Sequence, residues 1–168
     1  VLRRTHPDVQ VVVVGDGPER ARLGTLVSDM GLTGTVCFTG RLDDVGPVWP
    51  SLDVYVVTSI FEGGVSMSVL EAMDNGLPVV TTAAGGVAEA VVDGETGYVV
   101  TRDQERGALA AALAERAAAL LDDPALRARM GAAGARRVRE RFTIEQTAAQ
   151  TLRAYERCLA ARGRHARP

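Results

Sequence analysis

The chain has 168 residues, 46% of them hydrophobic, which suits one domain with a sizeable core. Its net charge is −2, so the composition gives no reason to expect binding to nucleic acid or to anionic membranes. All 19 basic residues are Arg, so any cationic contact to phosphate must come from Arg. Otherwise backbone N–H groups must bind the phosphate. With no apolar run near the ~20 residues of a membrane span, and no signal peptide expected, we predict a cytoplasmic protein.

The two cysteines and two histidines give no sign of a metal site or a disulfide. Cys37 and Cys158 lie far apart in the sequence, and we expect two reduced, mostly buried thiols. No cluster of Cys, His, Asp and Glu has metal-ligand spacing, and a site that uses both His6 and His165 is not expected.

The N-terminal stretch contains one strand and one helix. Residues 1–7 resemble the end of a helix, which suggests a fragment of a longer protein. The four valines at 11–14 predict a buried strand, which ends at Gly15. Pro18 suits the first turn of the helix that follows, and Gly31 closes it. Next come a short strand at 35–38, the turn that carries Arg41, and a loop with at most a short helix.

The central stretch, residues 54–86, carries two glycine pairs and two acids. A buried strand at 54–58 leads into a loop with Glu62, and a helix that carries Glu71 starts near Ser66. The order of strand, glycine loop and helix is typical of a site that binds a phosphorylated ligand at a helix N-terminus.

A second glycine pair follows the next strand. Pro78 opens that strand, and Gly85 and Gly86 end it. We expect one or two helical turns at 87–92 and a last short strand at 98–100.

The C-terminal third is expected to be helical. An Ala-rich amphipathic segment comes first, and Asp123 can N-cap the helix after it. Thr143 with Gln146 forms a capping box for a final helix through about Arg162. Residues 163–168 then form a short basic tail that we expect to be disordered.

Apolar strands alternate with helices over residues 9–100. This pattern predicts an α/β fold, with a Rossmann-like parallel sheet and helices on both of its faces. The helical C-terminal third is expected to pack across that sheet.

Six short motifs occur in order along the chain: GDGPER at 15–20, FTGR at 38–41, EGG…LEAM at 62–73, NGLPVV at 75–80, GGVAEAV at 85–91 and DGETGYVV at 93–100. Together they resemble the C-terminal, donor-binding domain of the retaining GT-B glycosyltransferases of the group-one (family-four) class. The resemblance covers residues 6–159, nearly the whole chain.

The resemblance implies a nucleotide-sugar-binding donor domain at 1–162 that lacks its first strand. The parent enzyme would transfer a hexosyl-type sugar from a UDP- or GDP-sugar to an acceptor hydroxyl, with retention and without a metal or other cofactor. An N-terminal acceptor domain is expected in the full-length protein, and the present chain alone is expected to be an inactive fragment. The predicted cytoplasmic location leaves open a peripheral position at the inner face of the membrane.

The resemblance also assigns roles to the two acids. Glu71 corresponds to the helix acid that accepts hydrogen bonds from both ribose hydroxyls, which suits the two oxygens of a carboxylate. Glu62 corresponds to the acid that contacts the donor sugar, and it is the catalytic candidate. Eight residues separate the two acids here, where the family has seven, so one residue of the Gly63–Gly64 pair is extra.

The remaining candidates are donor-binding residues. They are expected in the diphosphate loop, at the helix N-terminus and in the neighbouring turns: Gly63, Gly64, Val65, Ser66, Arg41, Gly15, Gly85 and Gly86. The loop glycines let the backbone approach the diphosphate, and the helix dipole favours its charge. Arg41 either contacts the base or the diphosphate, or is a surface residue.

Two other functions are compatible with parts of this pattern. A dinucleotide-dependent oxidoreductase is disfavoured, because Arg20 stands where its fingerprint needs a third glycine. A non-catalytic nucleotide-sugar-binding domain stays open, because the Gly-Arg pair and the Lys of the family's donor site are absent from this chain.

Overall fold

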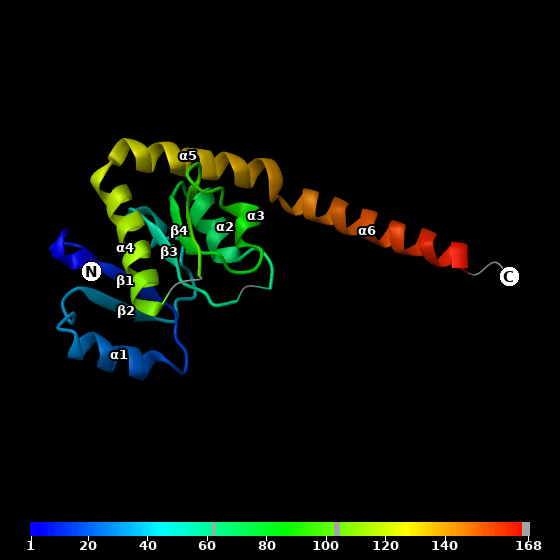
Figure 1. Ribbon diagram of the computed structural model, residues 1–168. Coiled ribbons are helices and arrows are strands. Elements are labelled where there is room, and N and C mark those ends of the chain that lie inside the picture. The colour runs from blue at the N-terminus through cyan, green and yellow to red at the C-terminus, as the bar shows by residue number, and fades with distance from the viewer. Residues whose placement is uncertain (62, 103–104, 166–168) are drawn as a thin grey trace.

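The structure is a computed structural model that describes residues 1–61, 63–102 and 105–165 (Figure 1). The described elements are, in chain order, η1 (Leu2–Arg4), β1 (Val11–Val14), α1 (Arg20–Asp29), β2 (Val36–Gly40), η2 (Trp49–Ser51), β3 (Tyr55–Val57), α2 (Met67–Asp74), β4 (Val79–Thr82), α3 (Val87–Ala90), β5 (Gly97–Val100), α4 (Arg106–Asp122), α5 (Pro124–Arg141) and α6 (Ile144–His165). The predicted α/β fold with parallel strands and a helical C-terminal third is confirmed.

The strands form two parallel groups. β1 pairs with β2, with Val11 opposite Val36, and β3, β4 and β5 form a second sheet in that order. In the described part of the chain, no strand pairing joins β1 to β3. In the described chain, the outer edge of β1 and the outer edge of β3 therefore have no neighbouring strand.

The prediction that residues 11–14 form a buried strand was wrong about the burial. Val11, Val12 and Val14 are each about 40% exposed, and Val56 of β3 is 46% exposed. Parallel strands are normally buried on both faces because helices and neighbouring strands cover them. Here β1 belongs to a pair of strands only, so its apolar side chains stay in contact with water.

The core is built around β4, whose four residues are all buried. Successive side chains of a strand point to opposite faces. Val79 accordingly packs in a cluster with Val69 and Met73 of α2, whereas Val80 packs in a second cluster with Leu113 and Leu120 of α4. Helices thus cover both faces of this sheet, as predicted.

Helix α5 lies across α2 and is held by glycine contacts (Figure 1). A Cβ atom added at Gly131 would lie 1.8 Å from the carbonyl oxygen of Gly76, which directly follows α2.

The side chain of Asp123 caps the N-terminus of α5. It accepts a hydrogen bond of 2.9 Å from the N–H of Leu126, as the sequence predicted.

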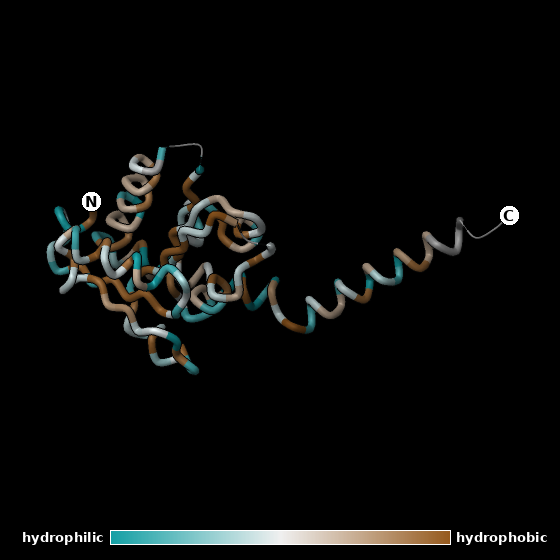
Figure 2. The backbone as a smooth tube through the Cα atoms, turned by 90° about the horizontal axis from the view of Figure 1, so that it is seen from below, coloured by the Kyte–Doolittle hydropathy of each residue, from teal (hydrophilic) through white to brown (hydrophobic). Residues whose placement is uncertain are grey.

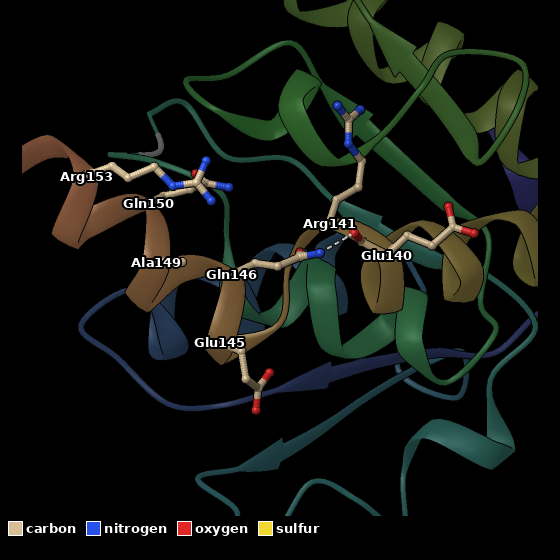
Figure 3. Close-up of a pocket in the computed structure, with 7 residues that line it drawn as sticks. All are labelled: Glu140, Arg141, Glu145, Gln146, Ala149, Gln150 and Arg153. Carbon is tan, nitrogen blue, oxygen red and sulfur yellow. Dashed lines mark hydrogen bonds between the residues drawn. The ribbon is translucent and has the colours of Figure 1, made fainter.

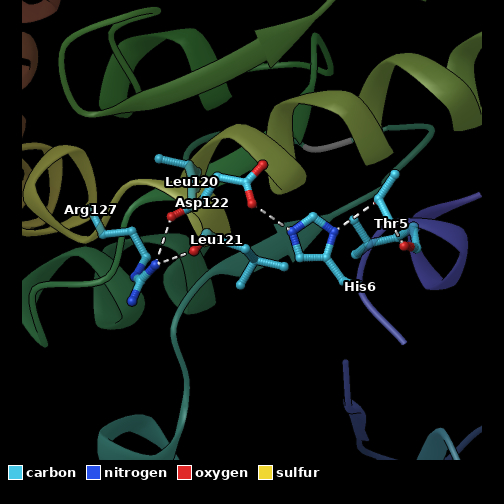
Figure 4. A network of polar contacts seen from close by, with 7 residues as sticks. Thr5, His6, Leu120, Leu121, Asp122 and Arg127 are labelled. Atoms are coloured by element: carbon cyan, nitrogen blue, oxygen red, sulfur yellow. Dashed lines mark hydrogen bonds and ion pairs between the residues drawn. The ribbon is translucent and has the colours of Figure 1, made fainter. Parts of the chain in front are cut away.

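Polar contacts fix the end of α4 (Figure 4). Arg127 of α5 donates to the carbonyl oxygens of Leu120 and Leu121, both at 2.8 Å. His6 Nε2 lies 3.0 Å from the Asp122 carboxylate, so the N-terminal segment is tied to the same end of α4.

Helix α6 projects away from the rest of the molecule (Figures 1 and 2). Leu152, Tyr155 and Leu159 form an exposed apolar stripe along it. The helix ends at His165, beyond the end predicted near Arg162, so residues 163–165 of the predicted tail are helical; residues 166–168 lie outside the described residues. Among the described helices, none has the length and apolar character that crossing a membrane requires.

The predicted capping box of α6 is only half formed. The N–H of Gln146 donates to the Thr143 hydroxyl at 3.3 Å, but the Gln146 side chain donates to the carbonyl of Glu140 instead of turning back to Thr143.

The exposure of the two cysteines also differs from the prediction. Both thiols are free as predicted, but Cys37 and Cys158 are exposed, because they lie on the thinly covered β2 and on the projecting α6.

The contact between Gly131 and Gly76 predicts that one added methyl group at Gly131 destabilises the folded chain. We expect Gly131→Ala to lower the free energy of unfolding by about 1–3 kcal/mol, because the new Cβ overlaps a backbone oxygen that cannot move without shifting the end of α2. Urea unfolding followed by the fluorescence of Trp49 measures this change.

Gly107→Ala in α4 is the matched control. No atom lies within 4 Å of its added Cβ, and Ala is favoured over Gly by up to about 1 kcal/mol in a helix. The control should therefore be neutral or stabilising. Equal stability of the Gly131→Ala chain and the unaltered chain would contradict the close packing of α5 on α2.

Candidate functional site

The loop between β3 and α2 carries the predicted diphosphate-binding residues. Its first part is anchored through two carbonyl groups. The Thr82 hydroxyl donates to the carbonyl of Ser59 at 2.7 Å, and the Arg102 guanidinium donates to the carbonyl of Ile60. The catalytic candidate Glu62 lies outside the described residues, so its role stays a prediction.

The N-terminus of α2 follows directly after this loop. Ser66 is its N-cap residue, with the extended backbone that this position favours, but its side chain makes no capping hydrogen bond. Its hydroxyl lies 3.0 Å from the Ser68 hydroxyl instead. The first N–H groups of a helix have no partner within the helix and carry the positive end of its dipole. This end of α2 therefore has the chemistry of an anion site.

Glu71 lies on α2, one turn beyond the N-terminal residues. Its side chain is exposed, whereas Val69, Ala72 and Met73 are buried against the core. Because the apolar face fixes the rotation of the helix, the Glu71 carboxylate is held on the solvent side and is open to a ligand. The side chain of Asn75 donates to the Glu71 carbonyl at 2.9 Å and ends the helix where the sequence predicted.

The second glycine pair packs directly on the first. A Cβ atom added at Gly86 would lie 2.7 Å from the carbonyl carbon of Gly64 and 3.0 Å from the backbone nitrogen of Val65. Gly85 has φ +51°, a left-handed conformation that favours glycine. The structure thus brings together two of the predicted segments, which are 21 residues or more apart in the sequence.

The turns after β1 and β2 also meet. The N–H of Gly15 donates to the carbonyl of Gly40 at 2.9 Å, which places Gly15 beside the turn that leads to Arg41. Arg41 is exposed. The Asp16 carboxylate accepts a hydrogen bond from the N–H of Gly17 at 2.8 Å, so Asp16 supports the turn itself. Gly15 and Arg41 lie at the β1–β2 pair, and the Gly64–Gly86 contact lies at the other sheet.

Sequence reasoning missed the residues that hold the loops in place. Thr82, Arg102 and Arg137 each donate a side-chain hydrogen bond to a backbone carbonyl that is 23 or more residues away. Such bonds depend only on the folded geometry and follow no short spacing. The one available signal was the position of Thr82 and Arg102 at or just after the carboxyl ends of β4 and β5, where ligand sites of parallel sheets lie.

A hollow of about 440 Å³ lies at the junction of α5 and α6 (Figure 3). Its polar lining consists of Glu140, Arg141, Glu145, Gln146, Gln150 and Arg153. Hydrogen bonds from the Glu145 backbone and from the Thr143 side chain hold the pKa of Glu145 below its ordinary value. None of the predicted donor-binding residues lines this hollow, so it is not the predicted site.

Within the described ranges, no group of three or more His, Cys, Asp or Glu residues is arranged to hold a metal ion.

Comparison with known proteins points to one family. A family model described as glycosyl transferases group 1 matches residues 1–137. The N-acetyl-alpha-D-glucosaminyl L-malate synthase of Bacillus anthracis is 32% identical over 146 residues, which cover 87% of this chain and 37% of that protein. The phosphatidyl-myo-inositol mannosyltransferase of Mycobacterium leprae is 36% identical over 154 residues, which cover 89% of this chain and 38% of that protein.

Solved structures agree with this match. The sucrose-phosphate synthase of Thermosynechococcus elongatus superimposes with a TM-score of 0.81 at 31% identity, over 95% of this chain and 41% of that chain. Anabaena HepE in complex with UDP superimposes with a TM-score of 0.75 at 28% identity, over 88% of this chain and 42% of that chain. The present chain therefore spans about two fifths of the length of these proteins.

The contact between the two glycine pairs can be tested in the isolated chain. We expect Gly86→Ala to change the amide NMR shifts of Gly64 and Val65, because the added methyl group must push that backbone away. Gly17→Ala is the control, since no atom lies within 4 Å of its added Cβ. Unchanged Gly64 and Val65 resonances in the Gly86→Ala chain would show that the two loops are not in contact.

Proposed function

Since this chain belongs to the group 1 glycosyltransferase family, we propose that it is the donor domain of a sugar-transferring enzyme. It would bind a UDP- or GDP-sugar and present it for transfer to an acceptor hydroxyl, with retention at the anomeric carbon. Support for the donor class comes from the UDP that is bound to the similar structure of Anabaena HepE. The transfer itself is proposed for the longer parent protein, because the chain spans about two fifths of its relatives.

The packing of Gly86 on Gly64 is the observation that carries this proposal. It holds the backbone of Gly64 and Val65 directly before the uncapped N-terminus of α2. A diphosphate placed there would accept hydrogen bonds from backbone N–H groups and would meet the positive end of the helix dipole. Within this chain, these dipoles together with Arg41 would stabilise the negative charge on the departing nucleoside diphosphate.

Glu71 and Arg41 are proposed to bind the nucleoside part. The exposed Glu71 carboxylate has two oxygens that can accept from the two ribose hydroxyls. Arg41 would contact the base or the diphosphate from the turn after β2, where Gly40 is fixed by its bond from Gly15. Gly85 is proposed to contact the donor through the turn that it forms with Gly86.

Glu62 is proposed to contact the hydroxyls of the donor sugar. In the transfer step, the bond between the anomeric carbon and the diphosphate oxygen breaks, the acceptor oxygen bonds to the same face of that carbon, and the proton of the acceptor hydroxyl passes to the departing diphosphate. The protein would act by positioning the two substrates and by stabilising the negative charge that develops on the diphosphate. The extra residue at Gly63 and Gly64 would widen the loop without moving α2.

The rest of the parent protein is proposed to supply two missing parts. One is the acceptor domain. The other is a strand between β1 and β3. No pairing joins these two strands in the described chain, and Val12 of β1 and Val56 of β3 are more than a third exposed. Such a strand would join the two parallel groups into one sheet of the donor domain. The predicted cytoplasmic location stays a prediction.

A non-catalytic nucleotide-sugar-binding domain is the second candidate. The extra residue between Glu62 and Glu71 favours it, because a longer loop can displace Glu62 from the donor sugar. The two candidates share the donor site and differ in turnover. Transfer of radiolabelled sugar by the full-length protein would support the enzyme, and donor binding without transfer would support the binding domain.

Glu71 provides the direct test of donor binding. We expect Glu71→Ala to weaken the affinity for UDP or GDP by about 1.5–3 kcal/mol, the contribution of a charge-assisted hydrogen bond. Isothermal titration calorimetry on the unaltered and the altered chain measures the difference. Glu115→Ala on α4 removes an exposed acid of another helix and should leave the affinity unchanged. Equal affinity of the Glu71→Ala and unaltered chains would remove Glu71 from the site.

We also predict that donor binding needs no divalent metal ion. The proposed diphosphate contacts are N–H groups and a helix dipole, which require no bridging cation. Titration of UDP or GDP into the chain should give the same affinity with EDTA as with added Mg²⁺. A loss of binding in EDTA that Mg²⁺ restores would show that a metal ion completes the site.

A further inference from the structure

We propose that Arg137 of α5 is a positioning residue for the donor loop, defined here as residues 63–66. Arg137 would act by holding the Gly85–Gly86 turn against the backbone of Gly64. The inference rests on the proposed function, because the donor loop is taken to bind the diphosphate. It adds a residue from the C-terminal third, which no sequence motif connects with the site.

Arg137 binds the end of α3 with two hydrogen bonds. Its Nε donates to the carbonyl of Ala90 at 2.7 Å, and its Nη2 donates to the carbonyl of Glu89 at 2.8 Å. The side chain is only partly exposed. The last carbonyl groups of a helix have no partner within it, so the guanidinium fills a requirement that α3 cannot meet alone.

Helix α3 transmits this contact to the donor loop. It has only four residues, and Gly86 is its N-cap. Val87 and Ala90 are fully buried, so the short helix can shift only if the core around it shifts as well. Fixing its last carbonyl groups therefore fixes Gly86, which touches the backbone of Gly64 and Val65.

The chemistry of Arg suits this role. Its planar guanidinium presents several N–H groups in a fixed fork, which can reach two adjacent carbonyl oxygens at once. A Lys at this position can approach one carbonyl but cannot reproduce the fork. Helix α5 is independently fixed on α2 by the Gly131 contact and by Arg139, whose Nε lies 3.1 Å from the Asp74 carboxylate. Arg137 thus extends from a helix whose own position is secure.

Arg139 offers a matched control, because it is also an α5 arginine, and its hydrogen bonds go to Asp74 of α2. We expect Arg137→Ala to weaken the affinity of the 168-residue chain for UDP or GDP about tenfold and to change the amide NMR shifts of Gly64 and Val65. Arg137→Lys should recover part of both. Arg139→Ala should leave the affinity within about twofold of the unaltered chain and the Gly64 and Val65 shifts unchanged. Calorimetry, amide NMR spectra and urea unfolding on all four chains make the comparison.

The outcomes separate the inference from the proposed function. Failure of the unaltered chain to bind either nucleotide contradicts the proposed function, and the amide shifts of Gly64 and Val65 then decide on Arg137 alone. Unchanged shifts and affinity in the Arg137→Ala chain overturn the inference. So does an equal loss of affinity in the Arg139→Ala chain, because the effect would then follow from loosening α5 in general.

Discussion

The close approach of two backbones, at Gly86 and Gly64, is the constraint on which the candidate site depends. No residue with a side chain can replace Gly86 without moving the Gly64 carbonyl, since the added atom would lie 2.7 Å from its carbon. The surrounding contacts keep this approach in place. Thr82 and Arg102 hold the start of the loop after β3, and Arg137 holds the short helix that begins at Gly86. A flexible glycine segment is thereby made into a defined surface in front of α2.

Features with a local chemical cause were predictable from the sequence. The ends of α2 follow from Ser66, which suits an N-cap, and from Gly76, which takes φ +77° after the last turn. The cap of α5 by Asp123 depends on atoms three residues apart. The buried β4 follows from an apolar run between Pro78 and the second glycine pair. In each case the residues that determine the structure are close in the chain.

Features that depend on distant neighbours were not predictable. Four valines in a row predict a strand at β1, but its exposure depends on whether another strand lies beside it. The exposure of Cys37 follows from the same two-stranded arrangement. Arg137 reaches carbonyl groups 47 and 48 residues away, and nothing in its own segment indicates that contact. The glycine pairs, the helix N-terminus, Glu71 and Glu62 were predicted as parts of a donor site, and their roles in that site remain predictions.

The projection of α6 has a consequence for how the unfolding of this protein is measured. Its 22 residues extend for about 33 Å, and helices in proteins owe most of their stability to the packing of an apolar face, whereas Leu152, Tyr155 and Leu159 of α6 are exposed. The helix and the packed body should therefore melt as separate cooperative units, not in one two-state transition. The single tryptophan, Trp49, is buried in the body and reports on that unit alone. Circular dichroism in the far ultraviolet averages over both units, so its midpoint will not agree with that of the fluorescence.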